Sequence, residues 1–201
     1  MEEWLETLAA RTPTPGGGAV AAMAAASAAA LIGMVSIYTT GEKWTDREPR
    51  MLELNALAAQ WRIQALVLAD EDEVAFAAVG AAYALPKTTD GEIETRQKAI
   101  QAALKGAAEP PVRTAQLAAL IVESAAELVG TANPNVLSDV GVASAMAEAA
   151  LSSASLNIAI NASQISDHSE KGRLSAALEV AAYDGLRARL VTAQVMAAMK
   201  P

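Results

Sequence analysis

The segment from Ala19 to Tyr38 restricts the fold of this chain more than any other, because its 20 residues include no charged side chain. A helix of that length can span a bilayer. More than half of the segment is alanine, glycine or serine, however, and a helix that is apolar on every side can also be the central helix of a soluble bundle. We favour the bundle, because the helices predicted for the rest of the chain are amphipathic and acidic.

Composition supports an all-α fold. Alanine, which has the highest helix propensity, provides 49 of the 201 residues, and aromatic residues provide only 3%. We therefore predict a single domain over residues 1–201, built as an antiparallel helical bundle around a buried Ala-rich central helix. Its helices are expected over residues 2–10, 19–38, 47–85, 90–106, 110–130, 138–166 and 170–200.

Local signals set these boundaries. Asp46 is predicted to cap the third helix, with Pro49 in its first turn, and Thr89 and Glu92 form a capping box. The pair Pro110-Pro111 is predicted to open a new helix, because proline is tolerated best in a first turn. An apolar stripe at helical spacing marks the expected buried face of the third helix, and it consists of Leu52, Ala56, Ala59, Ile63 and Leu66.

Charge and rare residues exclude several partners. The formal net charge of −8 argues against nucleic acid and anionic lipid, so we expect neither a nucleic acid nor a membrane as partner. The chain has no cysteine and one histidine, His168, which excludes a multi-histidine metal site within one chain. Its start lacks the basic region of a secretory signal, so we expect a cytoplasmic protein. A mean hydropathy of +0.24 suggests that further surface is buried in a homodimer.

Four polar features are candidates for chemistry. Gly16-Gly17-Gly18 precedes a helix, where glycine lets backbone N–H groups approach an anion, although a flexible linker or a tight turn has the same composition. Asp70 continues the apolar stripe and is either a buried functional carboxylate or part of a solvated acidic face. Asp139 lies at a helix start, where it or the preceding serine could simply cap the helix. Asn157 and Asn161 lie one turn apart and are expected to make an interhelical hydrogen bond.

Six segments of the chain are similar to segments of one known family, and they occur in the same order. They are Thr12–Ala22, Asp70–Phe76, Tyr83–Lys87, Ala99–Lys105, Asn133–Ala143 and Leu156–Asn161. Together they extend over most of the chain and resemble the family of formiminotetrahydrofolate cyclodeaminases and methenyltetrahydrofolate cyclohydrolases. The resemblance implies an all-helical and commonly dimeric enzyme that acts on a tetrahydrofolate substrate and needs neither a metal nor a nucleotide cofactor.

The resemblance also implies candidate site residues. It makes Asp139 the first candidate for catalytic proton transfer and Asp70 the second. Substrate-binding residues are expected in the Gly-rich loop, in two basic turns and just before Asp139, and they are Pro13, Gly16, Gly17, Gly18, Lys43, Lys87, Asn135 and Ser138. The Thr12–Gly18 loop and the Asn133–Asp139 turn are accordingly predicted to lie close together.

Two reactions are implied, and the sequence leaves open which one is physiological. Cyclodeamination closes the 5,10-methenyl bridge of 5-formiminotetrahydrofolate with loss of ammonia, and the cyclohydrolase reaction opens that bridge with water. The turn Gly41–Trp44 is less basic than in many family members. The alternative is therefore a non-catalytic helical folate-binding or assembly protein that has kept the fold.

Overall fold

The charge-free segment forms the centre of the structure. In the computed structural model, which describes residues 2–199, it is helix α2 (Gly17–Ile37) and packs against helices α3 (Glu48–Tyr83), α4 (Asp90–Leu128) and α5 (Leu137–Gln164). Helix α2 is long and apolar enough to cross a membrane, but 61% of its most apolar window is buried inside the bundle. The predicted buried central helix is therefore confirmed.

Small side chains let the neighbouring helices approach α2 closely. Ala22, Ala25 and Ala29 on α2 have no exposed surface, and Ile32 continues this inward row. Helix α6 (His168–Ala198) packs on α4 and α5 and completes the bundle. Every regular element among the described residues is helical, which confirms the all-α prediction.

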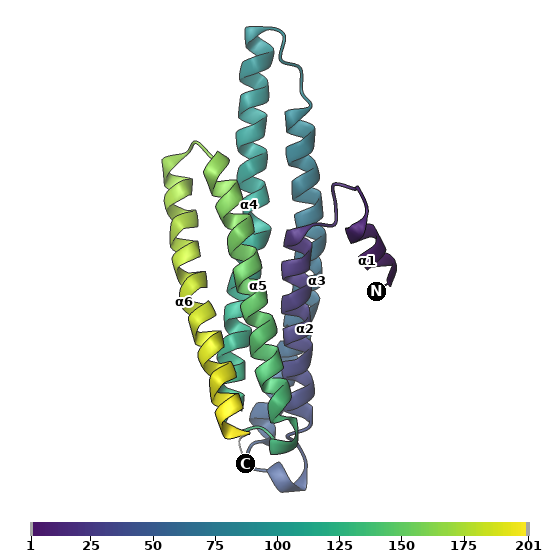
Figure 1. Cartoon of the computed structure of the whole chain (residues 1–201), viewed down its shortest axis with the longest axis vertical. Coiled ribbons are helices and arrows are strands. Elements are labelled where there is room, and N and C mark those ends of the chain that lie inside the picture. Colours follow the sequence, from purple (N-terminus) through teal and green to yellow (C-terminus); the bar gives the residue numbers. More distant parts are fainter. Residues whose placement is uncertain (1, 200–201) are drawn as a thin grey trace.

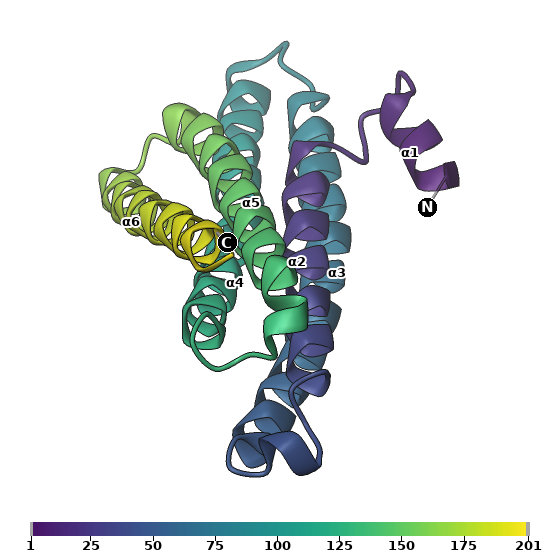
Figure 2. The same ribbon diagram turned by 60° about the horizontal axis from the view of Figure 1, so that its bottom comes forward.

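Two parts of the chain extend from the bundle. Figure 1 shows the hairpin of α3 and α4 rising beyond α5 and α6. The short helix α1 (Glu2–Ala9) lies beside the bundle in Figures 1 and 2 and is joined to α2 by the Gly-rich loop. At the other end of α2, the 3₁₀ turns η1 (Glu42–Trp44) and η2 (Pro134–Val136) precede α3 and α5.

Helix α4 runs without a break through Pro110 and Pro111, so the prediction of two helices in this region was wrong. Proline lacks the N–H that would bond to the carbonyl four residues earlier. For Pro111 that carbonyl belongs to Ala107, and it accepts a hydrogen bond of 3.1 Å from Nδ2 of Asn161 on α5. A neighbouring helix thus supplies the missing donor, and the expected interhelical bond is confirmed for Asn161. For Asn157 that expectation was wrong, because its Nδ2 donates within α5 to Ser153 O.

The starts of α3 and α4 were predicted with different success. The capping box is confirmed, because Thr89 Oγ1 accepts a bond from Glu92 N and the Glu92 carboxylate accepts one from Thr89 N. Asp46 does not cap α3, because the preceding turn continues through Arg47, which occupies the N-cap position without a side-chain bond. Pro49 does lie in the first turn of α3, as expected.

The apolar stripe that was expected to face the core faces outward from α3. Leu52, Ile63 and Leu66 are 49%, 59% and 45% exposed. The buried face lies elsewhere on the helix and contains Met51, Leu54, Ala58, Trp61, Ala65 and Leu68. Helical spacing detects both faces, and the face with Trp61 is turned inward because burying that side chain removes more apolar area from water.

Candidate functional site

The Gly-rich loop and the first turn of α2 line a cavity of about 310 Å³, which we call the loop cavity. This volume lies at the lower end of the range for small-molecule sites. The other walls come from α3, α4 and α5, so four helices meet there. The main contributors are Pro13, Thr14, Gly16, Gly17, Gly18, Asp72, Phe76, Asn157, Ile160, Asn161 and Gln164.

Asp72 supplies the carboxylate of the loop cavity. It reaches from α3 to the backbone of α2, where a Cβ added to Gly18 would lie 2.1 Å from Asp72 Oδ1. Burial raises the pKa of the Asp72 carboxyl above its ordinary value, although a hydrogen bond from the backbone N–H of Ala19 opposes this rise. The charge of Glu73 adds a smaller upward contribution to that pKa. Asp72 is therefore a shielded carboxyl group suited to giving and taking a proton.

Asp72 also completes the start of α2. Gly16 occupies the N-cap position of this helix and makes no side-chain capping bond. The Asp72 carboxylate of α3 lies at this turn instead, against Gly18 and near the backbone N–H of Ala19, which lowers its pKa. A carboxylate at this place also faces the positive end of the helix dipole. The Gly-rich sequence thus lets a carboxylate from another helix approach the start of α2 closely.

Two asparagines from α5 contribute amide groups to the same cavity. Asn161 Nδ2 donates to Ala107 O at 3.1 Å and to Asn157 O at 3.0 Å. Asn157 Nδ2 donates to Ser153 O at 2.9 Å and would lie 3.7 Å from a Cβ added to Gly17. Backbone carbonyl groups therefore hold both amides in place at the wall of the loop cavity.

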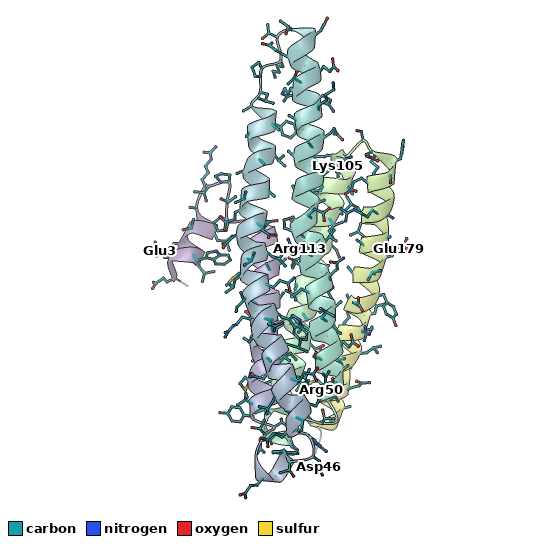
Figure 3. The ribbon with its side chains drawn as sticks, turned by 180° about the vertical axis from the view of Figure 1, so that it is seen from behind. Glu3, Asp46, Arg50, Lys105, Arg113 and Glu179 are labelled. Atoms are coloured by element: carbon teal, nitrogen blue, oxygen red, sulfur yellow. The ribbon has the colours of Figure 1, made fainter. Side chains whose placement is uncertain are left out.

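Two basic side chains on α4, one of the helices around the loop cavity, are paired with carboxylates. Arg113 on α4 bonds to Glu71 on α3, and Lys105 bonds to Asp167 at 2.6 Å; Figure 3 shows Arg113 and Lys105 along α4. The bond from Lys105, together with backbone N–H groups at the start of α6, holds the pKa of Asp167 below its ordinary value. Each of these two cations is thus offset by its own partner.

The Asn133–Asp139 turn lies at the opposite end of α2 from the Gly-rich loop. Asn133 fixes it there, because Nδ2 donates to Tyr38 O and the backbone N–H donates to Thr39 Oγ1. The length of α2 separates the two segments by roughly 30 Å, at about 1.5 Å per residue. A single chain therefore does not bring the two predicted halves of the site together, and for one chain the prediction of proximity was wrong.

The other predicted residues at that end have varied surroundings. Asp139 is half-buried in the first turn of α5, but neither it nor Ser138 caps the helix, because a valine holds the N-cap position. Asn135 and Ser138 are exposed. Lys43 lies in η1, with its amino group 5.2 Å from the ring centroid of the adjacent tryptophan. The catalytic role of Asp139 stays a prediction.

Asp70 and Lys87 lie outside the loop cavity. Lys87 is exposed in the turn between α3 and α4, and Asp70 is exposed beside a shallow groove of about 590 Å³ between these helices. The interpretation of Asp70 as a buried carboxylate was wrong, because the stripe that it continues faces outward. Asp72 is the carboxylate that turns inward. A sequence signal for it existed, since Asp72 follows the buried Leu68 by one helical turn.

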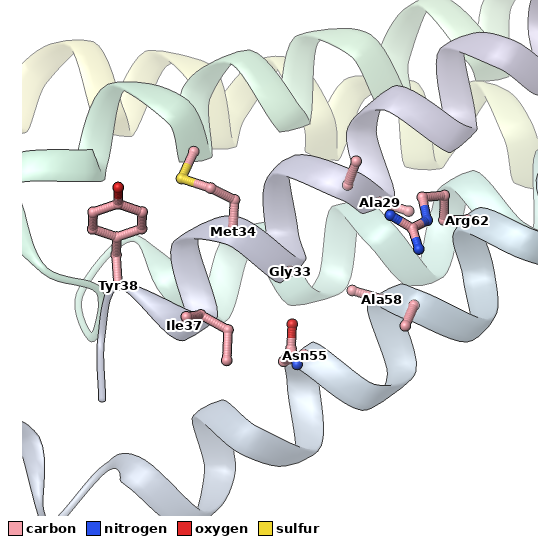
Figure 4. A pocket seen from close by; sticks show the side chains of 10 residues that line it. Ala29, Gly33, Met34, Ile37, Tyr38, Asn55, Ala58 and Arg62 are labelled. Atoms are coloured by element: carbon pink, nitrogen blue, oxygen red, sulfur yellow. The ribbon is translucent and has the colours of Figure 1, made fainter. Parts of the chain in front are cut away.

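A further cavity of about 310 Å³ lies between α2 and α3, nearer the C-terminal end of α2. Figure 4 shows Asn55 and Arg62 of α3 beside Gly33 and Met34 of α2. A Cβ added to Gly33 would lie 3.3 Å from Asn55 Oδ1, so glycine permits this close approach. Its described lining includes no carboxylate, so proton transfer has a better candidate in the loop cavity.

Comparison with known proteins decides the family. The sequence model of the formiminotransferase-cyclodeaminase family matches residues 1–180. The chain belongs to this family. A methenyltetrahydrofolate cyclohydrolase from Methylorubrum extorquens is 37% identical over 168 residues, which are 83% of this chain and 81% of that relative. The resemblance found in the sequence is therefore confirmed.

Other family members differ in size and name. The formimidoyltransferase-cyclodeaminase of Rattus norvegicus is 32% identical over 83% of this chain, and the matched part is 31% of that protein. The chain therefore spans about a third of that relative. The crystal structure of the formiminotetrahydrofolate cyclodeaminase from Thermotoga maritima aligns with a TM-score of 0.88 at 29% identity, covering 100% of this chain and 97% of the other. The family fold thus extends over the whole chain.

Proposed function

We propose that this family member is an enzyme that closes or opens the 5,10-methenyl bridge of tetrahydrofolate, and that the loop cavity is its site. The single observation that supports this site is the Asp72 carboxyl group, partly buried against the Gly-rich start of α2. Both reactions require protons to be moved at a carbon between two nitrogens. A shielded carboxyl with a raised pKa can perform such transfers in either direction.

Opening the bridge uses the carboxylate first as a base. Asp72 takes a proton from water while the water oxygen bonds to the methenyl carbon, which gives a neutral tetrahedral carbinol. The bond from this carbon to N5 then breaks, and N5 takes the proton from Asp72. The remaining hydroxyl proton leaves to solvent as the N10-formyl group forms. One proton is released overall, and Asp72 returns to its starting state.

Closing the bridge uses the same group in the other order. The formimino group enters as its protonated cation. N10 attacks the formimino carbon and transfers its proton to Asp72, and the tetrahedral species then expels ammonia as Asp72 returns that proton to the leaving amine. The carbon keeps its oxidation level in both reactions, so no redox cofactor is needed, and we propose that Asp72 performs the proton transfers without a metal. General acid–base catalysis of this kind contributes roughly 10²–10⁴ in rate, and positioning supplies the rest.

The assay follows the absorbance of the methenyl form after the protein is mixed with one of two substrates. With 5-formiminotetrahydrofolate a rise identifies a cyclodeaminase, and with 5,10-methenyltetrahydrofolate an accelerated fall identifies a cyclohydrolase. We expect at least one of these changes, at a rate proportional to protein concentration. Tight folate binding without turnover would instead identify the non-catalytic alternative.

The outward face of α3 supports a second proposal, that two copies form a homodimer. Ile63, Leu66, Val67 and Val74 are between 45% and 71% exposed, although large apolar side chains are usually buried. A partner copy covering this face would remove them from water. The same dimer could bring the Asn133–Asp139 turn of one copy near the Gly-rich loop of the other.

The substitution Ile63→Glu tests the homodimer. Because Ile63 is 59% exposed within one chain, we expect the helical fold to persist while the charge prevents association. Sedimentation velocity at micromolar concentration should then show a monomer, with unchanged helical circular dichroism. The exposed neighbour Gln64 offers a control, and Gln64→Glu should behave like the wild type. A monomeric wild-type protein would contradict the proposal directly.

A further inference from the structure

The side chain of Asn161 is oriented by a backbone carbonyl group of α4 that lacks its usual N–H donor. Pro111 cannot bond to Ala107 O, and Asn161 Nδ2 occupies that carbonyl at 3.1 Å. The same nitrogen donates to Asn157 O at 3.0 Å, so both hydrogens of the amide are used. The reverse orientation would place Oδ1 against two carbonyl oxygens, which is unfavourable. Asn161 Oδ1 is therefore fixed as an acceptor on the wall of the loop cavity.

Asn157 has the same arrangement one turn earlier on α5. Its Nδ2 donates to Ser153 O at 2.9 Å, which leaves Oδ1 as the acceptor of this amide. Among residues 2–199, no hydrogen bond is made to Oδ1 of Asn157 or Asn161. With the Asp72 carboxylate, the loop cavity thus has three side chains that present acceptors. A matching ligand must present N–H groups there rather than carboxylates.

We propose that Asn157 and Asn161 accept hydrogen bonds from N–H groups of a reduced pterin ring, and so place the ring half of the substrate inside the loop cavity. This inference rests on the proposed function, because it takes a tetrahydrofolate as the ligand. A tetrahydropterin has an amino group and several ring N–H groups, which match the acceptors of the cavity. The glutamate tail has only carboxylates at its end and belongs outside.

The test combines Asn161→Ala with Pro111→Ala. In the wild-type background, Asn161→Ala leaves Ala107 O without its donor and lowers the melting temperature. In the Pro111→Ala background, the new backbone N–H can bond to Ala107 O, so the same change should shift the melting temperature much less. The affinity for 5-formyltetrahydrofolate should fall about tenfold in both backgrounds, because Oδ1 is lost in both. Pro111→Ala alone should bind nearly as the wild type does, because Asn161 Nδ2 still donates to Asn157 O and so keeps its orientation.

The ring alone provides a second measurement. We expect 6-methyltetrahydropterin to compete with 5-formyltetrahydrofolate on the wild type, with an inhibition constant about tenfold higher for Asn161→Ala. Affinity restored by Pro111→Ala would mean that Asn161 is only structural, and this result would overturn the inference. Unchanged affinity of Asn161→Ala, or no competition by the ring, would overturn it as well. A wild type that binds no tetrahydrofolate at all would instead refute the proposed function.

Discussion

Replacing Asp72 with asparagine is expected to lower methenyl turnover by roughly 10²–10⁴, because an amide cannot accept and return a proton. The fold should not suffer. An asparagine Oδ1 can still accept the bond from the N–H of Ala19, and it caps a helix about as well as aspartate does. Turnover and melting temperature measured on the same preparation separate the chemical role of Asp72 from its structural one.

The pH dependence of stability gives this variant a second signature. Burial raises the folded-state pKa of Asp72 above 3.8, so the folded state binds a proton more tightly than the unfolded state does. The stabilisation from protonated Asp72 is complete below its unfolded pKa, and it is lost as the pH rises through its folded pKa. At neutral pH the wild type therefore has a buried charge that Asp72→Asn lacks. At pH 7 the melting temperature of the variant should equal or exceed that of the wild type. Any such excess should disappear in acid, where Asp72 of the wild type is protonated.

Asp139→Asn is the matched control for the location of the chemistry. Asp139 lies at the far end of α2, so its removal leaves the loop cavity intact. Turnover that survives Asp139→Asn but not Asp72→Asn would place proton transfer at the Gly-rich loop. The opposite pattern would transfer the reaction to the Asn133–Asp139 end and contradict the proposed site. Similar losses in both variants would indicate one composite site, which needs a second copy of the chain.

Gly18→Ala should lower the stability of the chain more than any other glycine-to-alanine substitution does. The added Cβ would lie 2.1 Å from Oδ1 and 2.3 Å from Cγ of Asp72, so either α2 or the carboxylate has to move. Glycine to alanine normally favours a helix by about 1 kcal/mol, but overpacking of this kind costs about 1–3 kcal/mol. We expect a net loss in the free energy of unfolding, measured by urea titration, together with a large loss of turnover.

Two companion variants show whether the contact with Asp72 is responsible. Gly16→Ala places its Cβ where nothing lies within 4 Å, at an extended backbone that alanine tolerates, so its stability should remain near that of the wild type. Adding Asp72→Ala to Gly18→Ala removes the obstacle and should recover most of the lost stability. If Gly18→Ala unfolds at the wild-type urea concentration, the close approach of Asp72 to α2 is disproved.

Most of the fold could be predicted from local patterns, and the errors have a common physical cause. The breaks around α2, the capping box before α4 and the turn before α5 depend on neighbouring residues, so they were visible in the sequence. The continuity of α4 through Pro111 depends on a donor from Asn161, which lies 50 residues later and meets the helix only in the folded bundle. Similarly, α3 has two apolar faces, and contact with α2 decides which one is buried.

The candidate site was predicted in part for the same reason. The Gly-rich loop was recognised as a binding segment, and its glycines do line the loop cavity. Asp70 was preferred over Asp72 because the wrong face of α3 was taken as buried. The two carboxylates are two residues apart, which places them on nearly opposite sides of the helix. The position of Asp139 relative to the loop depends on the antiparallel course of α5, which no local motif records.

The position of Asp72 beside the start of α2 separates the anchoring of this helix from the chain that precedes it. A helix normally takes its cap from the residue before its first turn, which ties its start to the direction of the incoming chain. Here the residue at that position is Gly16, and a carboxylate from inside the bundle lies at the first turn. The contact between Asp72 and the first turn of α2 therefore does not depend on the direction from which the preceding chain arrives. In the rat relative, the matching segment is only 31% of a longer polypeptide, which shows that such a domain can be part of a larger chain.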